Sequence, residues 1–367
     1  MTTEDLKQMT EKIGYGVFGL GVGRNHVSGA LKADGCAFVA ICDIHEETLH
    51  RVGDEYGIAP ENRYTSFDEM LKRPDIAAVS ICTPSGMHRE HAVKAMKAGK
   101  HVLTEKPLEI RLERIDEMLS VAEEERRLLG CVFQSRLAPA YRFVKETIDS
   151  GRMGKLITCN FHLKWYREDS YYRKNGGWRG TWAMDGGGAI MNQTVHTVDL
   201  MQWLMGPVSS IFAKTGTYTH DIETEDTAVA AVTFENGAIG TLIGTTCAYP
   251  GLEVSVQIHG AKGSIYVSNQ RIVLFKMADD DSEFSEEKRV LELYGPDRPK
   301  EADAQAGIKT GHAGQVQDMI DAVIQGRPPL IEGREGRAAV EIIQALYESA
   351  KSGREISLPY QPEVVGV

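Results

Sequence analysis

The first third of the chain alternates short apolar segments with helix-like segments, and this alternation limits the possible folds most strongly. The apolar segments are YGVFG (15–19), AFVAICD (37–43), IAAVSICT (76–83) and HVLTE (101–105). Helix-like stretches at about 25–33, 46–57 and 111–128 separate or follow them. Strands that alternate with helices predict a parallel, doubly wound sheet, and nearly continuous apolar strands predict burial of both sheet faces. We therefore expect an α/β domain over residues 1–134.

The remaining residues, 135–367, follow a different pattern. Strand-like segments come in succession from LITCNFHLKWY (156–166) onward, and two of them flank Asn236-Gly237, a strong hairpin signal. Consecutive hairpins predict a second, α+β domain with a large open mixed or antiparallel sheet. A helix is expected at about 189–205, and the acidic segment 278–288 predicts a solvated loop. Helix-like segments follow at about 311–325 and 334–352, and the sequence leaves open whether these two pack back on the first domain. The length of 367 residues also favours two domains.

Charge and composition exclude several classes of partner. The net charge of −11 argues against nucleic acid, because proteins that bind phosphate backbones concentrate Lys and Arg. No apolar run reaches the roughly 18–20 residues that cross a bilayer, and the polar start of the chain predicts no secretory signal. Six cysteines occur without a C-x-x-C pair, which favours buried thiols over disulfides or a metal site. These features predict a cytoplasmic protein.

A glycine-rich loop follows the first predicted strand and precedes a helix. It reads Gly19-Leu20-Gly21-Val22-Gly23-Arg24, so Gly19 permits a tight turn and Gly21 lets the backbone approach a pyrophosphate at the helix N-terminus. Gly23 stands one position earlier than the third glycine of the usual dinucleotide fingerprint. The alternative is an ordinary strand-to-helix turn. The candidate cofactor residues of this loop are Gly19, Gly21, Val22, Gly23 and Arg24.

Asp43 ends the second predicted strand, where a carboxylate binds the adenosine ribose hydroxyls in a Rossmann domain. Considered alone, it is more simply a strand-end or helix-capping Asp, but the glycine loop favours the cofactor role. Ile44, His45 and two glutamates follow it, and no Lys or Arg is there to bind a 2′-phosphate. The sequence therefore predicts NAD, with NADP disfavoured.

Two segments carry side chains suited to proton transfer. Glu105-Lys106-Pro107 ends the strand HVLTE, and the carboxyl ends of strands face the ligand crevice in open α/β sheets. The second segment follows three glycines and carries Asn192, His196 and Asp199, which lie on one face of an α-helix. An amide, an imidazole and a carboxylate can bind a hydroxyl, take its proton and fix the imidazole tautomer. The alternative is a buried histidine with a capping aspartate.

The segment YREDSYYRKNGGWRGTW (166–182) is rich in aromatic residues and arginine. Aromatic faces pack on the C–H faces of sugar rings, and Arg binds hydroxyls or anions. A loop core or an oligomer contact would explain the same composition equally well. The candidate substrate residues here are Tyr166, Tyr172, Trp178 and Arg179.

Several motifs together resemble the glucose-fructose oxidoreductase / inositol dehydrogenase / rhizopine-catabolism family (Gfo/Idh/MocA). They are FGLGVGRNH, CTPSGMH, AGKHVLTEKPL, GRMGKL, WRGTWAMDGGGAIMNQTVHTVDLMQWLMGP and HGAKGSIYV, and they span nearly the whole chain. The resemblance implies an N-terminal Rossmann domain and a second domain whose sheet mediates a homodimer or homotetramer. It also implies hydride transfer between NAD(P) and a ring hydroxyl of a sugar, cyclitol or sugar derivative.

The resemblance also assigns roles to single residues. It implies that Lys106 and His196 are the active-site lysine and histidine, and that the Lys106–Pro107 peptide bond is cis. Many members have Asp where this chain has Asn192, which leaves Asp199 as a supporting carboxylate. The remaining implied positions are Thr83 and Pro84 beneath the nicotinamide ribose, His88 and Glu105 beside them, and Arg136 facing the substrate.

The sequence leaves two other functions open. In one, a bound NAD oxidises the substrate transiently, and the protein is a redox-neutral glycosidase or lyase. In the other, it is a non-catalytic regulator that binds the cofactor, although the presence of both Lys106 and His196 argues against this. Which sugar or cyclitol is bound, and which carbon reacts, stays open.

Overall fold

A computed structural model describes residues 12–299 and 309–360. Residues 1–11, for which the sequence predicts no secretory signal, lie outside the described residues. In these two ranges, no helix is both long and apolar enough to cross a bilayer. The chain divides into two compact units. The first consists of the described residues of Met1–Gln134 and Ile308–Arg337, and the second of those of Ser135–Gly307 and Ala338–Val367.

The first unit contains a six-stranded parallel sheet in the order β3-β2-β1-β4-β5-β6. Its strands are β1 (Ile13–Phe18), β2 (Cys36–Cys42), β3 (Arg63–Tyr64), β4 (Ala78–Ile81), β5 (His101–Thr104) and β6 (Leu129–Cys131). This order is that of the doubly wound Rossmann fold, which confirms the predicted fold class. The strands β1, β4 and β5 are neighbours, so the loops that follow them share one edge of the sheet.

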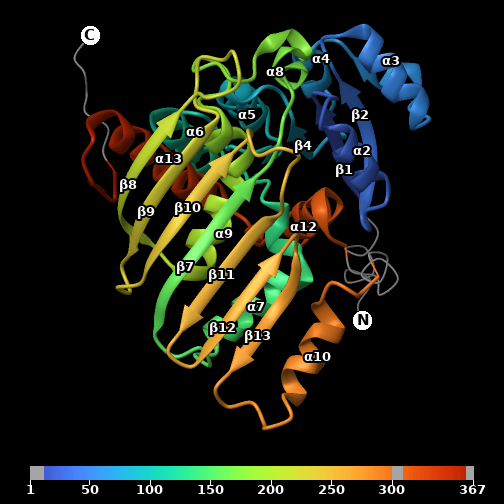
Figure 1. The fold of residues 1–367 in the computed structure, drawn as a ribbon. Helices are drawn as coiled ribbons and strands as arrows, with labels where there is room; N and C mark the ends of the chain where they lie inside the picture. Colours follow the sequence, from blue (N-terminus) through green and yellow to red (C-terminus); the bar gives the residue numbers. More distant parts are fainter. Residues whose placement is uncertain (1–11, 300–308, 361–367) are drawn as a thin grey trace, which may run out of the picture. The chain divides into compact units, whose positions relative to one another are not determined.

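Helices connect the strands of this sheet (Figure 1). They are α2 (Arg24–Leu31), α3 (Glu46–Glu55), α4 (Phe67–Leu71), α5 (His88–Lys97) and α6 (Leu112–Glu124). A further helix, α12 (Gly311–Gln325), comes from much later in the chain and packs on α2. Gly29 of α2 allows this approach, since a Cβ atom there would lie 2.9 Å from Ala313 Cα. The buried residues Met319 and Ile320 of α12 join the core formed by Val17 and Ile41.

The second unit contains an eight-stranded sheet in the order β13-β12-β11-β7-β10-β9-β8-β14. The strands are β7 (Leu156–Lys164), β8 (Val208–Gly216), β9 (Thr227–Phe234), β10 (Ile239–Thr245), β11 (Val254–Gly260), β12 (Gly263–Ser268), β13 (Arg271–Met277) and β14 (Ile356–Ser357). The pair β7–β10 is parallel and the other pairs are antiparallel, so the predicted mixed sheet is confirmed. The predicted hairpin joins β9 to β10 through Gly237, whose φ is +84°.

One face of this sheet is covered and the other is open. Along β9, Ala228, Ala230 and Val232 are buried while Val229 and Ala231 are exposed. The helices α7 (Pro139–Asp149) and α9 (Val195–Met205) lie behind the strands in Figure 1. The long helix α13 (Gly333–Ser352) begins in the first unit and ends in the second.

Two predictions about local structure were wrong in part. The acidic segment 278–288, expected to be a solvated loop, contains the start of helix α10 (Ser285–Tyr294). Asp280 accepts hydrogen bonds from the amides of Glu286 and Glu287 at 3.2 and 3.1 Å, so the acidic side chains cap the helix. The helix expected from about 189 to 205 is a π-helical turn, Ala189–Thr194, followed by α9.

Candidate active site

The glycine loop between β1 and α2 has the shape that a dinucleotide needs. Gly19 has a φ of +86°, and a Cβ atom there would lie 2.6 Å from the carbonyl oxygen of Cys82. A Cβ atom on Gly23 would lie 2.0 Å from the carbonyl oxygen of Gly19. These two glycines therefore let the chain turn tightly and let α2 start close to β1. Gly23 provides this close approach one position before the usual third glycine.

Gly21 differs from Gly19 and Gly23 because no contact within the described protein would prevent a larger side chain there. Among the described residues, apart from its two chain neighbours, none has an atom within 4 Å of the place where its Cβ atom would stand. Gly21 precedes α2, whose first turn carries no acidic residue. A pyrophosphate fits such a position, because backbone amides and the helix dipole favour an anion there. The residues present therefore fit the phosphates of NAD.

Asp43 follows β2 and is nearly buried. Its Oδ2 atom accepts a hydrogen bond from the amide of Leu20 at 2.7 Å, and Oδ1 accepts one from the amide of His45 at 2.9 Å. The carboxylate is thus fixed against the glycine loop. Arg24, the cation within the loop, forms an ion pair with Glu55 at 2.6 Å.

The loops after β4 and β5 are joined by His88. Its Nδ1 atom lies 2.9 Å from the carbonyl oxygen of Pro107, and its Nε2 atom lies 2.8 Å from that of Thr83. The Lys106–Pro107 peptide bond is cis, which confirms the expectation. The predicted cofactor segment Thr83–Pro84 and the predicted active-site Lys106 are therefore held next to each other.

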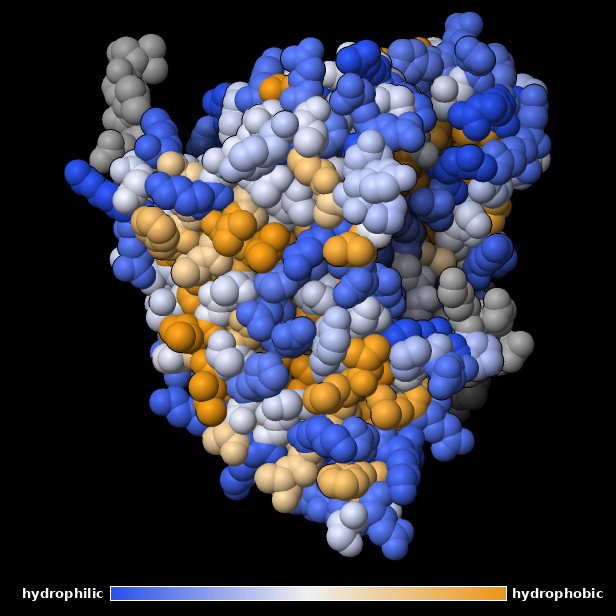
Figure 2. Space-filling view, in the orientation of Figure 1, coloured by the Kyte–Doolittle hydropathy of each residue, from blue (hydrophilic) through white to orange (hydrophobic). Residues whose placement is uncertain are grey.

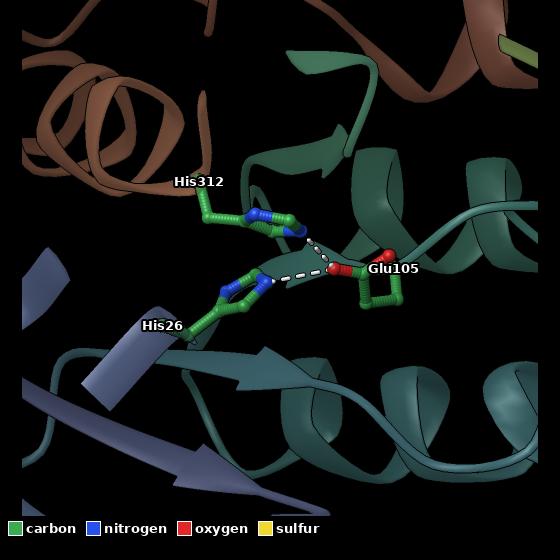
Figure 3. A group of neighbouring side chains, drawn as sticks. All are labelled: His26, Glu105 and His312. Carbon is green, nitrogen blue, oxygen red and sulfur yellow. Dashed lines mark hydrogen bonds and ion pairs between the residues drawn. The ribbon is translucent and has the colours of Figure 1, made fainter. Parts of the chain in front are cut away.

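Glu105, predicted as a cofactor residue, is 4% exposed and lies in a cluster of two histidines (Figure 3). Its Oε1 atom accepts hydrogen bonds from Nε2 of His26 at 2.9 Å and Nε2 of His312 at 3.1 Å. Burial opposes ionisation of Glu105, but these N–H groups hold its pKa well below the ordinary value. Neither histidine was predicted as a site residue from the sequence. The place of His26 on the buried face of α2 was a usable signal, whereas nothing in the sequence connects His312 to Glu105.

Among the described residues, two groups of side chains could hold a metal ion, because the potential ligand atoms of each group all lie within 4.8 Å of one another. The groups are His26, Glu105 and His312, and His220, Asp226 and Cys247. In the second group, Oδ2 of Asp226 already accepts hydrogen bonds from the amides of Tyr218, Thr219 and His220 at 2.9, 2.9 and 3.2 Å. These bonds occupy the carboxylate oxygen that a cation would need. The prediction of no metal site stays a prediction.

Two of the three glycines before the predicted catalytic helix are explained by close packing within the second unit. A Cβ atom on Gly187 would lie 2.0 Å from Oη of Tyr347, and one on Gly188 would lie 1.9 Å from the carbonyl oxygen of Glu225. The buried carboxyl group of Glu225 accepts hydrogen bonds from the amide of Ile190 and the hydroxyl of Tyr347, both at 2.9 Å. The glycines therefore permit close packing at the start of the π-helical turn.

Asn192, His196 and Asp199 lie in consecutive helical segments. Asn192 belongs to the π-helical turn and donates from Nδ2 to Asp185 Oδ1 at 2.6 Å, while its Oδ1 atom accepts from Tyr171 Oη at 3.0 Å. His196 and Asp199 lie in α9, so the face predicted for an unbroken α-helix applies to these two residues only. Asp185, the buried carboxylate beside Asn192, was not predicted from the sequence.

Arg136 and Asp199, assigned separately from the sequence, bind each other. Nε of Arg136 donates to Oδ2 of Asp199 at 2.8 Å, and NH2 donates to Oδ1 at 2.6 Å. Both side chains are buried, and the guanidinium also lies over the ring of Trp203. A direct contact of Arg136 with a substrate therefore stays a prediction.

The aromatic segment forms a packed cluster around short helix α8 (Asp169–Arg173). Tyr172 is buried and its hydroxyl lies 2.8 Å from Oγ1 of Thr246, so it belongs to the core of the segment. Arg179 lies over the rings of Tyr171 and Trp178 at 4.8 and 4.9 Å from their centroids. Tyr166 packs edge-on against Tyr249. Roles in substrate binding for these residues stay predictions.

Comparison with known proteins agrees with this geometry. The chain is 26% identical over 362 residues to myo-inositol 2-dehydrogenase of Thermotoga maritima, covering 96% of this chain and 99% of that protein. It is 32% identical over 254 residues to 1,5-anhydro-D-fructose reductase of Ensifer adhaerens, covering 68% and 73%. Among solved structures, the WlbA dehydrogenase of Bordetella pertussis in complex with NADH and UDP-GlcNAcA has a TM-score of 0.86 and 33% identity, covering 96% and 99%.

Two family models match the two parts of the chain. A model described as an oxidoreductase family with an NAD-binding Rossmann fold matches residues 13–133. A model described as the GFO/IDH/MocA C-terminal domain matches residues 141–266. Together the two matches extend over more than half of the chain, and the protein therefore belongs to the GFO/IDH/MocA family of NAD-binding oxidoreductases.

Proposed function

We propose that the protein transfers a hydride between NAD and a ring hydroxyl or ketone of a sugar, cyclitol or sugar derivative. One observation carries the proposal: the glycine loop, Thr83 and Lys106 follow the neighbouring strands β1, β4 and β5. Ligands bind at the carboxyl ends of strands in open α/β sheets, so a cofactor in the glycine loop extends toward Lys106. Similar proteins that act on inositol and 1,5-anhydro-D-fructose support this substrate class.

In the proposed mechanism, bound NAD supplies the hydride acceptor and the protein handles the proton. Lys106 donates a hydrogen bond to the reacting oxygen. His196 takes the hydroxyl proton, since imidazole titrates closest to neutral pH among unperturbed side chains. Asn192, held by Asp185, binds the same substrate region, and Asp199 supports α9 through Arg136.

The aromatic segment supplies the proposed sugar contact. Tyr166 and Trp178 offer ring faces for the C–H groups of a sugar, and Arg179 offers N–H groups for its hydroxyls. The cluster of Tyr171, Trp178 and Arg179 supports this role because stacking holds the guanidinium in place.

The setting and assembly of the enzyme are also proposals. We infer a cytoplasmic enzyme because the cysteines are free thiols, as expected in a reducing compartment. We infer a homodimer or homotetramer through the open face of the eight-stranded sheet. Apolar side chains are exposed over its strands (Figure 2), including Phe212, Val229 and Ile239.

A substrate screen tests the function. Sugars, inositols and sugar acids are incubated with NAD or NADP, and formation of reduced cofactor is followed by absorbance. Accumulation of NADH with a ring-hydroxyl substrate is the expected result, and His196→Ala should lower the turnover about 10²–10⁴-fold. Product without NADH would indicate the redox-neutral glycosidase or lyase. NAD binding without turnover of any compound would indicate the regulator.

A further inference from the structure

A chain of buried hydrogen bonds runs through the first unit to Glu105. Oη of Tyr15 lies 2.6 Å from Oγ of Ser80, which lies 2.8 Å from Nδ1 of His26. Nε2 of His26 then lies 2.9 Å from Oε1 of Glu105. All four side chains are buried, so each of their polar hydrogens needs an acceptor within the protein.

The ionised Glu105 carboxylate fixes the direction of this chain. A carboxylate only accepts, so Nε2 of His26 must carry a proton and donate to it. Burial lowers the pKa of His26, which leaves the ring neutral and its Nδ1 atom an acceptor. Ser80 therefore donates to His26, and Tyr15 donates to Ser80. The dashed lines in Figure 3 therefore mark two hydrogen bonds that Glu105 accepts, one from His26 and one from His312.

His312 brings a second donor to the same carboxylate from a remote part of the chain. It lies in the first turn of α12, and its Nε2 atom is 3.1 Å from Oε1 of Glu105. The other oxygen, Oε2, accepts a hydrogen bond from the backbone amide of Lys106 at 3.2 Å. Glu105 thus connects α2 and α12 to the backbone of Lys106.

We propose that His312 is a positioning residue for Lys106. By holding Oε1 of Glu105, it keeps Oε2 against the Lys106 amide and so fixes the backbone from which the Lys106 side chain extends. This inference rests on the proposed role of Lys106 in the reaction. Other titratable groups that influence Glu105 are His26 from α2, His88 from α5 and Cys82 after β4.

Amide hydrogen exchange of the NAD-loaded protein tests the proposal without a substrate. In the parent protein the Lys106 amide should exchange slowly, because it is bonded to Glu105. His312→Leu removes the second donor, so exchange at Lys106 should become at least about tenfold faster. His312→Gln places an amide N–H near the position of the imidazole N–H and should restore slow exchange to within about threefold. His50→Leu, on an exposed residue of α3, is the matched control and should change nothing.

Turnover with myo-inositol, or with the first active compound of the screen, provides the second readout. His312→Leu should lower kcat about 10- to 100-fold while the NAD dissociation constant changes less than about threefold. The acid limb of its pH profile, where activity falls as the pH is lowered, should also lie at a higher pH than that of the parent. The reason is that Glu105 has lost a hydrogen-bond donor that lowers its pKa. His312→Gln should regain most of the activity.

Two outcomes separate this inference from the proposed function. If Lys106→Met abolishes turnover while His312→Leu leaves kcat, the acid limb and exchange at Lys106 unchanged, the positioning role is wrong and the function stands. If Lys106→Met retains turnover, the assigned chemistry is wrong, and exchange at Lys106 alone decides whether His312 positions that backbone. Unchanged exchange in His312→Leu overturns the inference in either case.

Discussion

At the scale of single residues, we expect Asp43 to determine which cofactor the glycine loop accepts. Two backbone amides hold its carboxylate in place, and the neighbouring Arg24 is engaged by Glu55. A 2′-phosphate would therefore meet a fixed negative charge, and the four residues that follow Asp43, Ile44 to Glu47, include no Lys or Arg to offset it. NAD should bind at least about tenfold more tightly than NADP, a difference of roughly 1.4 kcal/mol. Calorimetric titration of both cofactors measures this ratio.

The variant Asp43→Ala serves as the companion to this measurement. It should bring the dissociation constants of NAD and NADP closer together, because it weakens NAD binding and removes the repulsion of the 2′-phosphate. Equal or tighter binding of NADP by the parent protein would contradict the assignment of Asp43.

Gly21 and Gly23 should respond oppositely to replacement by alanine. The site of a Gly21 side chain is empty of protein atoms, so Gly21→Ala should leave the melting temperature unchanged or slightly raised. The same methyl group would obstruct the pyrophosphate, so NAD affinity should fall at least about tenfold. Gly23→Ala should instead destabilise the fold, since its Cβ atom would lie 2.0 Å from the Gly19 carbonyl oxygen.

Thermal denaturation with and without NAD measures both effects. If Gly21→Ala binds NAD like the parent protein, the open side of the loop does not face the cofactor.

The sequence predicted residues whose neighbours are close along the chain or follow adjacent strands. The glycine loop, Asp43 and Lys106 could be found because the geometry of a doubly wound sheet determines where each strand ends. His312 and Asp185 could not be found in this way. His312 meets its partner Glu105 only through tertiary packing, and Asp185 meets its partner Asn192 only through an irregular loop.

At the scale of elements, the start of the π-helical turn depends on Glu225. Burial raises the pKa of this carboxyl group from 4.5 to about 7, despite hydrogen bonds from Ile190, Gly188 and Tyr347. The folded protein therefore retains a proton on Glu225 at pH values where the unfolded chain has lost it. Its contribution to stability is complete below about pH 4.5 and is lost as the pH rises through about 7.

Urea denaturation of the parent and of Glu225→Gln over this pH range tests the linkage. Because glutamine does not ionise, the parent's free energy of unfolding should fall relative to the variant's between about pH 4.5 and 7. Glu235→Gln, at an exposed position of the β9–β10 hairpin, is the matched control and should show no such change. A constant difference between parent and Glu225→Gln would refute the raised pKa.

The elements themselves were predictable where a local pattern determines them. Apolar runs specified the strands, and Asn236-Gly237 specified the hairpin. The π-helical turn was not predictable, because apolar spacing does not distinguish it from an α-helix. The glycines before it indicate the close approach of a ligand or of another backbone segment, and the groups that approach them are the Tyr347 side chain and the Glu225 backbone, which lie far along the chain.

At the scale of the whole molecule, the open face of the eight-stranded sheet is the surface through which we expect the protein to form oligomers. The strand register places Phe212, Val229 and Ile239 on the same face of β8, β9 and β10, and all three are exposed. An exposed apolar face of this kind marks an interaction site. The double variant Val229→Glu/Ile239→Glu should therefore lower the molar mass measured by light scattering relative to the parent.

Leu330→Glu is the control for this experiment, because it introduces the same charge at an exposed apolar residue outside the sheet. A parent protein that is monomeric at micromolar concentration would contradict the proposed assembly.

The predicted two-part architecture was accessible from the sequence because the strand patterns of the two parts differ. The grouping of α12 with the first unit, however, depends on packing between remote segments.

The grouping of α12 with the first unit has a consequence for biosynthesis. A ribosome that has completed β6 must still translate through Gln325 before α12 can pack on α2. At about 5–20 residues per second, this delay is on the order of 10–40 s. During that interval the nascent nucleotide-binding sheet lacks His312, and the apolar surface that receives Met319 and Ile320 is uncovered. Until α12 is synthesised, the emerging chain therefore exposes an apolar surface that a chaperone can bind.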